Sequence, residues 1–232
     1  DLLFAEGADV GDSGCVYVDV VTQVIILSNL ANYYVNLHSV ANPAGAARGQ
    51  MAPTPVSVFV DAAQEVDGVG DGMANGTVDL EFKLGEGVVC WDIVDLSGLS
   101  SSLTAGHIHE GMAGMNGALI VDLLFAEGAG VGDSGCVYAD VATQVIILGN
   151  LANYYVNLHS VANPAGAARG QMAPTPVSVF VDAAQEVDGV GDGMANGTVD
   201  LEFKLGEGVV CWDIVDLSGL SSSLTAGHIH EG

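Results

Sequence analysis

The chain has 232 residues and carries 29 Asp and Glu against four Lys and Arg, a formal net charge of −25 at pH 7. This charge excludes nucleic acid as a natural partner, because the phosphate backbone would be repelled. Half of the residues are hydrophobic, so a substantial core can be buried despite the acidity. The apolar segments, such as residues 20–27 and 56–60, are far shorter than the roughly 20 residues that span a bilayer. We therefore expect a folded protein without a membrane span.

The sequence repeats itself with a period of 121 residues. Residues 1–111 align with residues 122–232 without a gap, and only four pairs differ: Asp9/Gly130, Val18/Ala139, Val21/Ala142 and Ser28/Gly149. The period is too long for one solenoid unit and close to the usual size of an independent domain. We expect each period to have its own hydrophobic core within a tandem array.

Two Pro-x-Pro stretches, Pro53-Thr54-Pro55 and Pro174-Thr175-Pro176, have the composition of linkers. They leave one complete repeat at residues 53–173. Residues 1–52 then form the C-terminal part of a preceding repeat, and residues 174–232 the N-terminal part of a following one. We expect neighbours to complete both partial repeats, either along a longer chain or from other subunits.

The complete repeat consists of short β-type segments separated by turns rich in Gly and Asp. In chain order these segments are residues 56–60, 77–84, 88–96, 118–125, 136–141 and 154–159. Residues 141–152 alone could form a helix, and only a brief one. So many short β-rich segments in a domain of this size predict an all-β fold, an antiparallel Greek-key sandwich.

Each period has two cysteines, without the C-x-x-C spacing of a zinc or redox site. Cys90 and Cys136 are 46 positions apart in extended sequence, and a disulfide between them would contribute roughly 4 kcal/mol of stability. The other interpretation is a pair of buried thiols. Under the domain division above, Cys15 and Cys211 are expected to pair with cysteines outside this sequence.

All six histidines fall in two motifs, Gly-His-Ile-His-Glu-Gly and Tyr-Tyr-Val-Asn-Leu-His. On a strand, His107 and His109 share one face while Ile108 points to the core. In the second motif, Tyr155, Asn157 and His159 share a face in the same way. Two such strands side by side would bring three imidazoles together as metal ligands.

We therefore predict a metal site at His107, His109 and His159, with His228, His230 and His38 as the corresponding ligands in the partial repeats. Three imidazoles with an open fourth position favour Cu(II), with zinc as the alternative. Glu110 or a water could complete the site, or Glu110 could orient a histidine. The competing interpretation is a solvated His-x-His pair without a function.

Calcium is a weaker prediction, at the acidic turns. Asp67, Asp71 and Asn75, with their copies Asp188, Asp192 and Asn196, are carboxylate and amide groups spaced along Gly-rich loops, which suits a hard cation. The spacing does not match an EF-hand, and a solvated turn explains it equally well.

Several motifs of the complete repeat resemble the CHRD domain, named for chordin. They are Ala63-Gln64-Glu65-Val66, Leu96-Ser97-Gly98-Leu99, the segment 104–111, Asn116-Gly117, and the segments 154–159 and 163–172. The resemblance covers almost the whole period. It implies an extracellular, immunoglobulin-like β-domain that is widespread in secreted microbial proteins. It also implies a domain that opens near Ala-Gln-Glu-Val and closes at Arg-Gly-Gln, which supports the linker boundaries.

We expect a structural protein rather than an enzyme: an extracellular or cell-surface filament of metal-binding domains whose partners are neighbouring copies joined head to tail. Residues 56–60, which follow the proline linker, could bridge neighbours as an added strand. The alternative is a first strand of their own domain.

Two other functions remain open at this stage. His-Ile-His-Glu-Gly is similar to the copper-ligand strand of Cu/Zn superoxide dismutases, which suggests a copper enzyme. Three histidines per domain are fewer than those enzymes use, and an anionic surface repels superoxide. The third function is an adhesive, ligand-binding module by analogy with chordin, a weak warrant because folds do not fix functions.

Overall fold

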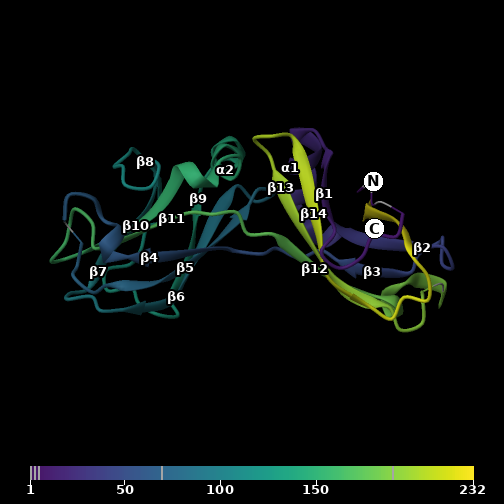
Figure 1. Cartoon of the computed structure of the whole chain (residues 1–232). Helices are drawn as coiled ribbons and strands as arrows, with labels where there is room; N and C mark the ends of the chain where they lie inside the picture. The colour runs from purple at the N-terminus through teal and green to yellow at the C-terminus, as the bar shows by residue number, and fades with distance from the viewer. Residues whose placement is uncertain (1, 3, 5, 69, 190) are drawn as a thin grey trace. The chain divides into compact units, whose positions relative to one another are not determined.

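The computed structural model describes residues 2, 4, 6–68, 70–189 and 191–232, and these form two compact units. The first, here called the continuous unit, is Pro55–Thr175. The second, the composite unit, combines Asp1–Thr54 with Pro176–Gly232 (Figure 1). The two outer segments, for which completion by neighbours was predicted, complete each other in the structure.

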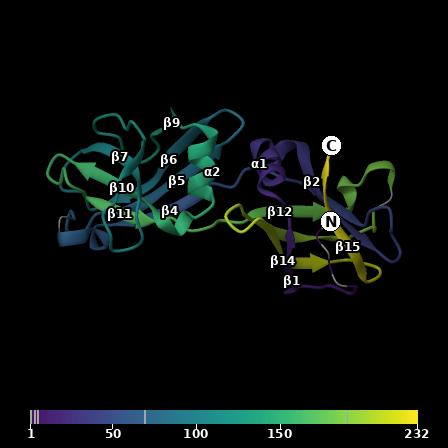
Figure 2. The same ribbon diagram turned by 90° about the horizontal axis from the view of Figure 1, so that it is seen from above.

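The continuous unit is an antiparallel β-sandwich, which confirms the predicted all-β class. Its strands are β4 (Val56–Asp61), β5 (Asn75–Lys83), β6 (Val88–Ser97), β7 (Leu103–Glu110), β8 (Leu119–Asp122), β9 (Ser134–Tyr138), β10 (Tyr154–Ser160) and β11 (Ala168–Gln171). They follow the order β8-β7-β10-β11-β4-β5-β6-β9. Strands β11 and β4 are paired only at Arg169 and Asp61, so the order divides there into two four-stranded layers. Figure 2 shows β10, β11 and β4 side by side.

The composite unit repeats this order with one strand fewer. Its strands are β1 (Ser13–Tyr17), β2 (Tyr33–Ser39), β3 (Ala47–Gln50), β12 (Val177–Asp182), β13 (Asn196–Lys204), β14 (Val209–Ser218) and β15 (Leu224–Glu231). The order is β1-β14-β13-β12-β3-β2-β15. Three of these pairings, β1 with β14, β12 with β3 and β2 with β15, join the N-terminal segment to the C-terminal one.

Alternation along the strands builds a separate core in each unit, as the repeat predicted. On β4, Val56, Val58 and Val60 are buried while Ser57 and Phe59 are exposed. The core of the continuous unit also contains Trp91 and Phe125, whose ring centroids are 4.2 Å apart. The composite unit has an equivalent cluster around Trp212 and Phe4.

The one brief helix expected in each repeat is present, as α1 (Val20–Ser28) and α2 (Val141–Leu148). Asp140 caps the start of α2, because its carboxylate accepts hydrogen bonds from the backbone N–H and the hydroxyl of Thr143, both at 3.0 Å. The helix ends four residues before the predicted limit, and a short 3-10 helix, Leu151–Asn153, follows it. Further 3-10 turns lie at Leu30–Asn32, Ala62–Gln64, Val66–Gly68, Ala183–Gln185 and Val187–Gly189.

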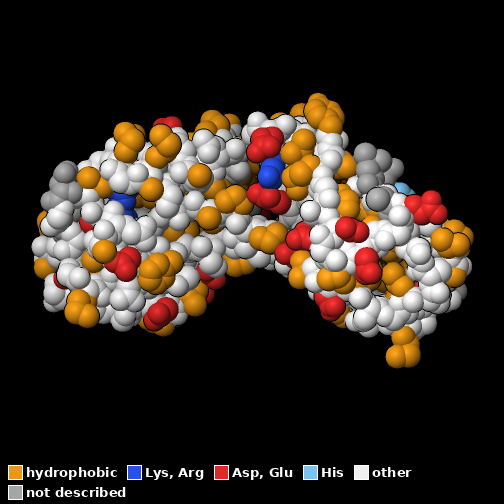
Figure 3. Space-filling model, in the orientation of Figure 1, with side chains coloured by type: hydrophobic (Ala, Val, Ile, Leu, Met, Phe, Trp, Pro, Cys, Tyr) orange, Lys and Arg blue, Asp and Glu red, His pale blue; other side chains and the backbone are white. Residues whose placement is uncertain are grey.

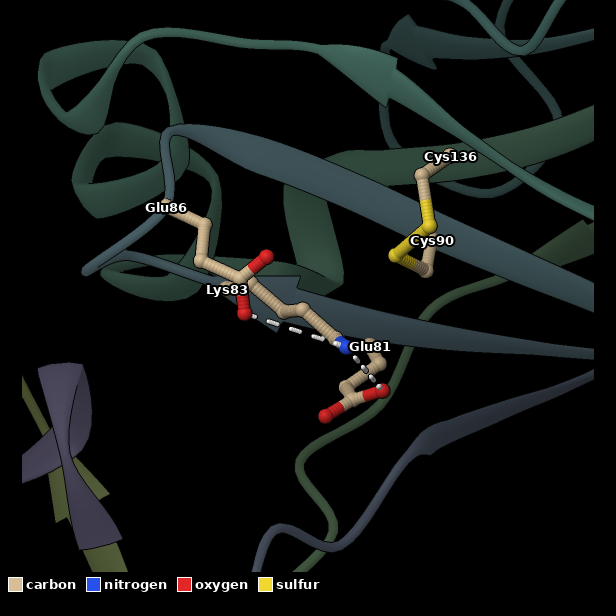
Figure 4. The surroundings of a disulfide bond; sticks show 5 residues. All are labelled: Glu81, Lys83, Glu86, Cys90 and Cys136. Atoms are coloured by element: carbon tan, nitrogen blue, oxygen red, sulfur yellow. Dashed lines mark ion pairs between the residues drawn. A yellow bond between two sulfur atoms is a disulfide. The ribbon is translucent and has the colours of Figure 1, made fainter.

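Both cysteine pairs form disulfides across neighbouring strands. Cys90 on β6 and Cys136 on β9 are bonded as predicted (Figure 4). The prediction for Cys15 and Cys211 was wrong, because they bond to each other. The reason is the composite unit, in which β1 pairs with β14 and sets Cys15 directly opposite Cys211.

The prediction that residues 56–60 bridge neighbouring repeats is also not borne out in this structure. Strand β4 lies between β11 and β5, and its counterpart β12 lies between β3 and β13. Each is therefore a strand of its own unit, the alternative considered above; β4 meets β11, and β12 meets β3, at a single residue pair.

The surface is strongly acidic. Figure 3 shows acidic side chains spread over the visible face with few basic ones among them. One of the four basic residues, Lys83, lies 3.6 Å from Glu81 and 4.0 Å from Glu86 (Figure 4). Within the described residues, no helix is both long and apolar enough to cross a membrane.

Candidate metal centre

Strands β7 and β10 are direct neighbours, and their register brings the predicted ligands of the continuous unit onto one face. His107 is opposite Asn157, His109 is opposite Tyr155, and His159 is opposite Ala105. The residues between them face inward, and Ile108 is completely buried. The alternation predicted for both motifs is present, and so is the adjacency of the two strands.

The three imidazoles converge. The candidate ligand atoms of His107, His109 and His159 all lie within 4.8 Å of one another, and Nδ1 of His107 is 2.9 Å from Nε2 of His159. Carbonyl oxygens determine which nitrogen carries the proton in two of the rings, because a carbonyl can only accept. His109 Nδ1 donates to the carbonyl of Gly117 and His159 Nδ1 to that of Pro164, each at 3.1 Å. Both rings therefore present an unprotonated Nε2.

The third ring can offer its other nitrogen. His107 Nδ1 donates to His159 Nε2 in the short contact, and a metal ion would replace that shared proton. The imidazole proton would then be on Nε2, which faces Asp122 Oδ1 at 3.8 Å. His109 Nε2 is buried without a hydrogen-bond partner among the described residues, a costly state for a polar atom. These donors fit a transition metal, and the carbonyl partners are the usual outer contacts of a ligating histidine.

Tyr155 and Arg169 hold the His109 ring in place. The ring stacks on Tyr155 at 9° between planes with centroids 5.1 Å apart, and the Arg169 guanidinium lies 3.6 Å from the centroid of the Tyr155 ring. Arg169 donates to the Met115 carbonyl at 2.8 Å and to Asn116 Oδ1 at 3.1 Å. Neither role could be predicted from the local sequence, because Arg169 lies on the short strand β11, whose place beside β10 depends on the fold.

Burial lowers the pKa of all three histidines. It is the largest cause for His107, where the neighbouring His159 lowers the pKa further and Asp122 opposes the change. Burial also lowers the pKa of His109 and of His159, against the hydrogen bonds to the carbonyls of Gly117 and Pro164. The neutral imidazole, which is the form that binds metal, is therefore favoured to a lower pH than in an exposed histidine.

Glu110 does not join the three histidines. It is the next residue after His109 on β7, so its side chain points to the other side of the strand. Its carboxylate accepts a hydrogen bond from Asn153 Nδ2 at 3.3 Å. Neither of the roles considered for Glu110 is supported by this geometry.

The composite unit contains the same cluster from the two outer segments. His228 Nδ1 is 3.1 Å from His38 Nε2, and His38 Nδ1 donates to the Pro43 carbonyl at 3.1 Å. His230 stacks on Tyr34, and its buried Nε2 has no partner among the described residues. Three residues that the sequence analysis placed in two separate partial repeats thus meet in one site.

The predicted calcium turns use their polar groups internally. Asp71 Oδ2 accepts hydrogen bonds from the backbone N–H and the hydroxyl of Ser100, both at 2.9 Å. Asn75 Nδ2 donates to the Met73 carbonyl. The side chains of Asp67 and Asp188 lie outside the described residues. Among the residues that are described, only the two histidine clusters have a metal-binding arrangement of His, Cys, Asp or Glu.

Fold and site together define a class: a disulfide-bonded antiparallel β-sandwich with a histidine cluster on one outer face. The family is shown by comparison, since the CHRD domain matches residues 56–172, which is half of the chain. The chain therefore belongs to the CHRD domain family, whose members are extracellular β-domains. No curated protein and no solved structure matches it.

Proposed function

We propose that this chain is a structural component of an extracellular or cell-surface filament, built from repeated CHRD domains that each bind one transition metal. The observation that carries the proposal is the convergence of three imidazoles, two of them oriented by carbonyls, in the continuous unit, together with the matching cluster in the composite unit. The protein acts by assembly, with neighbouring copies as partners, and not as an enzyme.

Copper is the metal we propose first, and zinc second. Divalent copper binds a given set of nitrogen ligands more tightly than the other first-row ions, and an extracellular site meets oxidised metal. The bound ion would supply a cross-link between β7 and β10 at His107, His109 and His159. Its function in this proposal is stability, because metal binding adds directly to the folding free energy of the domain that it holds together.

Assembly is proposed from the repetition of the unit. The strands of the composite unit follow the order of their counterparts in the continuous unit, and both units have a disulfide at the same place and the same histidine cluster. Units of the same build present the same surface, so a contact made between one pair of copies can be made again by the next pair. A contact that repeats without closing produces a helical filament.

Metal content tests the site. The native protein should bind two ions per chain, His109→Ala and His230→Ala should each bind one, and the double variant none. The two single variants are matched controls, because each removes one cluster and leaves the other. Retention of two ions by His109→Ala would disprove the three-histidine site.

Imaging and activity test the filament. Negative-stain images of the native material should show filaments with a regular domain repeat. A copper enzyme is the second candidate, because a three-histidine site keeps a coordination position open for a small molecule. Dispersed particles with superoxide dismutase activity would favour that candidate, and binding of a separate ligand by dispersed, inactive particles would favour an adhesive module.

A further inference from the structure

Strand β9 is the last strand in the order of the continuous unit, and its edge away from β6 carries unpaired backbone groups. Ile93 N–H donates to the Asp133 carbonyl at 3.0 Å, so alternate residues from Asp133 onward turn their backbone groups towards β6. The residues between them turn their N–H and C=O groups to the free edge, where no described residue pairs with them. These residues are Ser134, Cys136 and Tyr138.

This edge lacks the usual protection of a free strand. Proteins generally blunt a sheet edge with charged side chains, prolines or bulges. Strand β9 reads Ser-Gly-Cys-Val-Tyr, which contains no charge and no proline. The disulfide between Cys136 and Cys90 fixes β9 to β6 (Figure 4). A rigid, uncharged edge of this kind is a template beside which an extended peptide can add as a further strand.

A cavity of about 350 Å³ lies along the same edge. One wall is β9, and the other is the segment 123–129, which runs beside β7 in the other layer, since Gly128 N–H donates to the Leu103 carbonyl at 2.8 Å. The cavity is therefore at the side of the sandwich, between its two layers. Its lining is mostly apolar and includes Trp91, Leu123, Ala126, Ala129 and Val137, together with the acids Glu127 and Asp133.

The indole N–H of Trp91 has no acceptor in this cavity wall. Trp91 is only 6% exposed, and its Nε1 is buried without a hydrogen-bond partner among the described residues. Gly135 also lines the cavity and has no side chain to cover the indole, since a Cβ there would lie 3.3 Å from Nε1. An unpaired buried donor is costly. A side chain with an apolar ring and an acceptor oxygen, which is tyrosine, would fill the cavity and remove that cost.

The charges around the edge favour a basic partner over a second copy of this chain. Glu127 and Asp133 line the cavity, and Asp140 follows β9 at the start of α2. In the described strands of this layer the one basic residue, Lys83, lies 3.6 Å from Glu81. Two copies joined at β9 would bring their carboxylates together, whereas Lys or Arg in a partner would offset them.

We propose that the free edge of β9 binds an extended basic peptide of a partner protein by β-strand addition, with a tyrosine of the peptide in the cavity over Trp91. Peptide residues opposite Gly135 and Val137 face the cavity, and their backbone groups point to solvent. The residues that alternate with them pair with the free groups of β9. The histidine cluster lies on β7 and β10 in the other layer, so this binding requires neither a metal nor a filament.

The probe is the synthetic peptide Lys-Thr-Val-Thr-Tyr-Thr-Val-Thr-Lys, titrated into the full chain and followed by calorimetry and by amide exchange. With Tyr in the cavity, the Thr amides face β9 and the Tyr and Val amides face solvent. The peptide should protect the amides of Ser134, Cys136 and Tyr138 from exchange. No protection of these three amides at about 1 mM peptide overturns the inference.

Two N-methylated peptides test the strand pairing as a matched pair. Methylation of the two Thr amides beside Tyr should weaken binding at least about tenfold, because it removes two main-chain donors. Methylation of the two Val amides, which face solvent, should leave the affinity within about threefold of the parent peptide. An equal loss of affinity in both peptides would show that the peptide does not add as a strand.

Further controls test the partner's chemistry. Replacement of the peptide's Tyr by Phe should weaken binding at least about fivefold, because the Trp91 donor is left unpaired again. Replacement of both Lys by Gln should weaken binding at low ionic strength. In the chain, Glu127→Gln should reduce the protection of the β9 amides and leave the amides of the matching strand β1 as in the native chain.

If the Phe or the Gln peptide bound as tightly as the parent peptide, the proposed partner would be wrong. Protection of the three β9 amides by association of the chain with itself, without peptide, would assign this edge to a second copy instead.

Discussion

Arg169 shows how single residues support the site, because it is almost completely buried beneath the segment that follows β7. Its charge is balanced by two acceptor oxygens, the face of Tyr155, and Glu65. The carboxylate of Glu65 is incompletely hydrogen-bonded: its Oε1 is buried without a hydrogen-bond partner among the described residues. Burial raises the pKa of Glu65 to about 7, although Arg169 acts to lower it. Ionised Glu65 is therefore a destabilising group.

Glu65→Gln should stabilise the continuous unit at pH 8 relative to the native chain, and less so at pH 4.5. Because the folded pKa lies above the ordinary value, the native chain loses stability as pH rises through about 7. The expected gain is on the order of 1 kcal/mol after allowance for partial exposure. Urea unfolding at both pH values measures it. An equal gain in the free energy of unfolding at pH 8 and at pH 4.5 would show that ionisation of Glu65 is not the cause.

The histidines give the opposite pH dependence. The pKa values of His107, His109 and His159 are lowered in the folded state, so the unfolded chain binds protons more readily. The contribution of these histidines to the stability of the metal-free protein should be complete above about pH 6.5 and should be lost as the pH decreases below it. Thermal unfolding between pH 5 and 8 checks this. Stability that rises as the pH falls from 6.5 to 5.5, in a Glu65→Gln background, would contradict it.

At the residue scale, the sequence predicted which histidines lie together but not which residues support them. Alternation on two strands was enough to place the three histidines on one face. The roles of Tyr155, Arg169 and Asp122 depend on which strands are neighbours. The positions of β11 and β8 in the strand order cannot be predicted from a local sequence pattern. The contact between His107 and Asp122 crosses from β7 to β8.

At the scale of elements, strands with regular apolar alternation were predicted well and short ones were not. Strands β4, β5, β6 and β10 lie where the pattern placed them. Strand β11 reads Ala-Arg-Gly-Gln, which contains no apolar alternation, and its conformation depends on β10 beside it. The predicted strand at 118–125 is shortened to β8, because the chain turns at Leu124, which has a positive φ of 50°.

The two disulfides should differ in what they stabilise. Cys90–Cys136 joins residues 46 apart and Cys15–Cys211 residues 196 apart, corresponding to about 4 and about 5 kcal/mol on the chain-entropy estimate. Loss of the second should cost more, because it also fixes the two segments of the composite unit to each other. Urea unfolding of Cys15→Ser/Cys211→Ser and Cys90→Ser/Cys136→Ser variants compares them. If the Cys90→Ser/Cys136→Ser variant lost more free energy of unfolding than the other variant, the prediction would be wrong.

At the scale of the whole molecule, the sequence predicted the repeat but not how its outer segments are used. Local patterns show that residues 1–52 and 174–232 are incomplete repeats. They do not show that the two segments pair, because that pairing brings together residues almost 200 positions apart, such as Cys15 and Cys211. The near-identity of the repeats explains this pairing. Each outer segment carries the same contact residues as its counterpart in the continuous unit, so the two segments can pack against each other as those counterparts do.

The net charge of −25 opposes both folding and association. Raising the ionic strength from about 0.01 to about 0.15 M should raise the melting temperature and promote association of copies, because the Debye length falls from about 30 to about 8 Å. Calorimetry and light scattering at pH 7 measure the two effects. An equal osmolarity of sucrose serves as the uncharged control. If salt raised the melting temperature and the association no more than sucrose does, charge repulsion would not be the cause of either effect.

The bond between Cys15 and Cys211 also determines how the chain carries tension. A pull applied before Cys15 and after Cys211 passes directly through the sulfur bridge, so the continuous unit and both proline linkers lie outside the loaded path. That unit, with its histidine cluster, keeps its shape while the rest of the chain is stretched. For the same reason, one cut in the backbone between these cysteines leaves the two pieces covalently joined through the disulfide. A single proteolytic cleavage there does not separate the chain into two fragments.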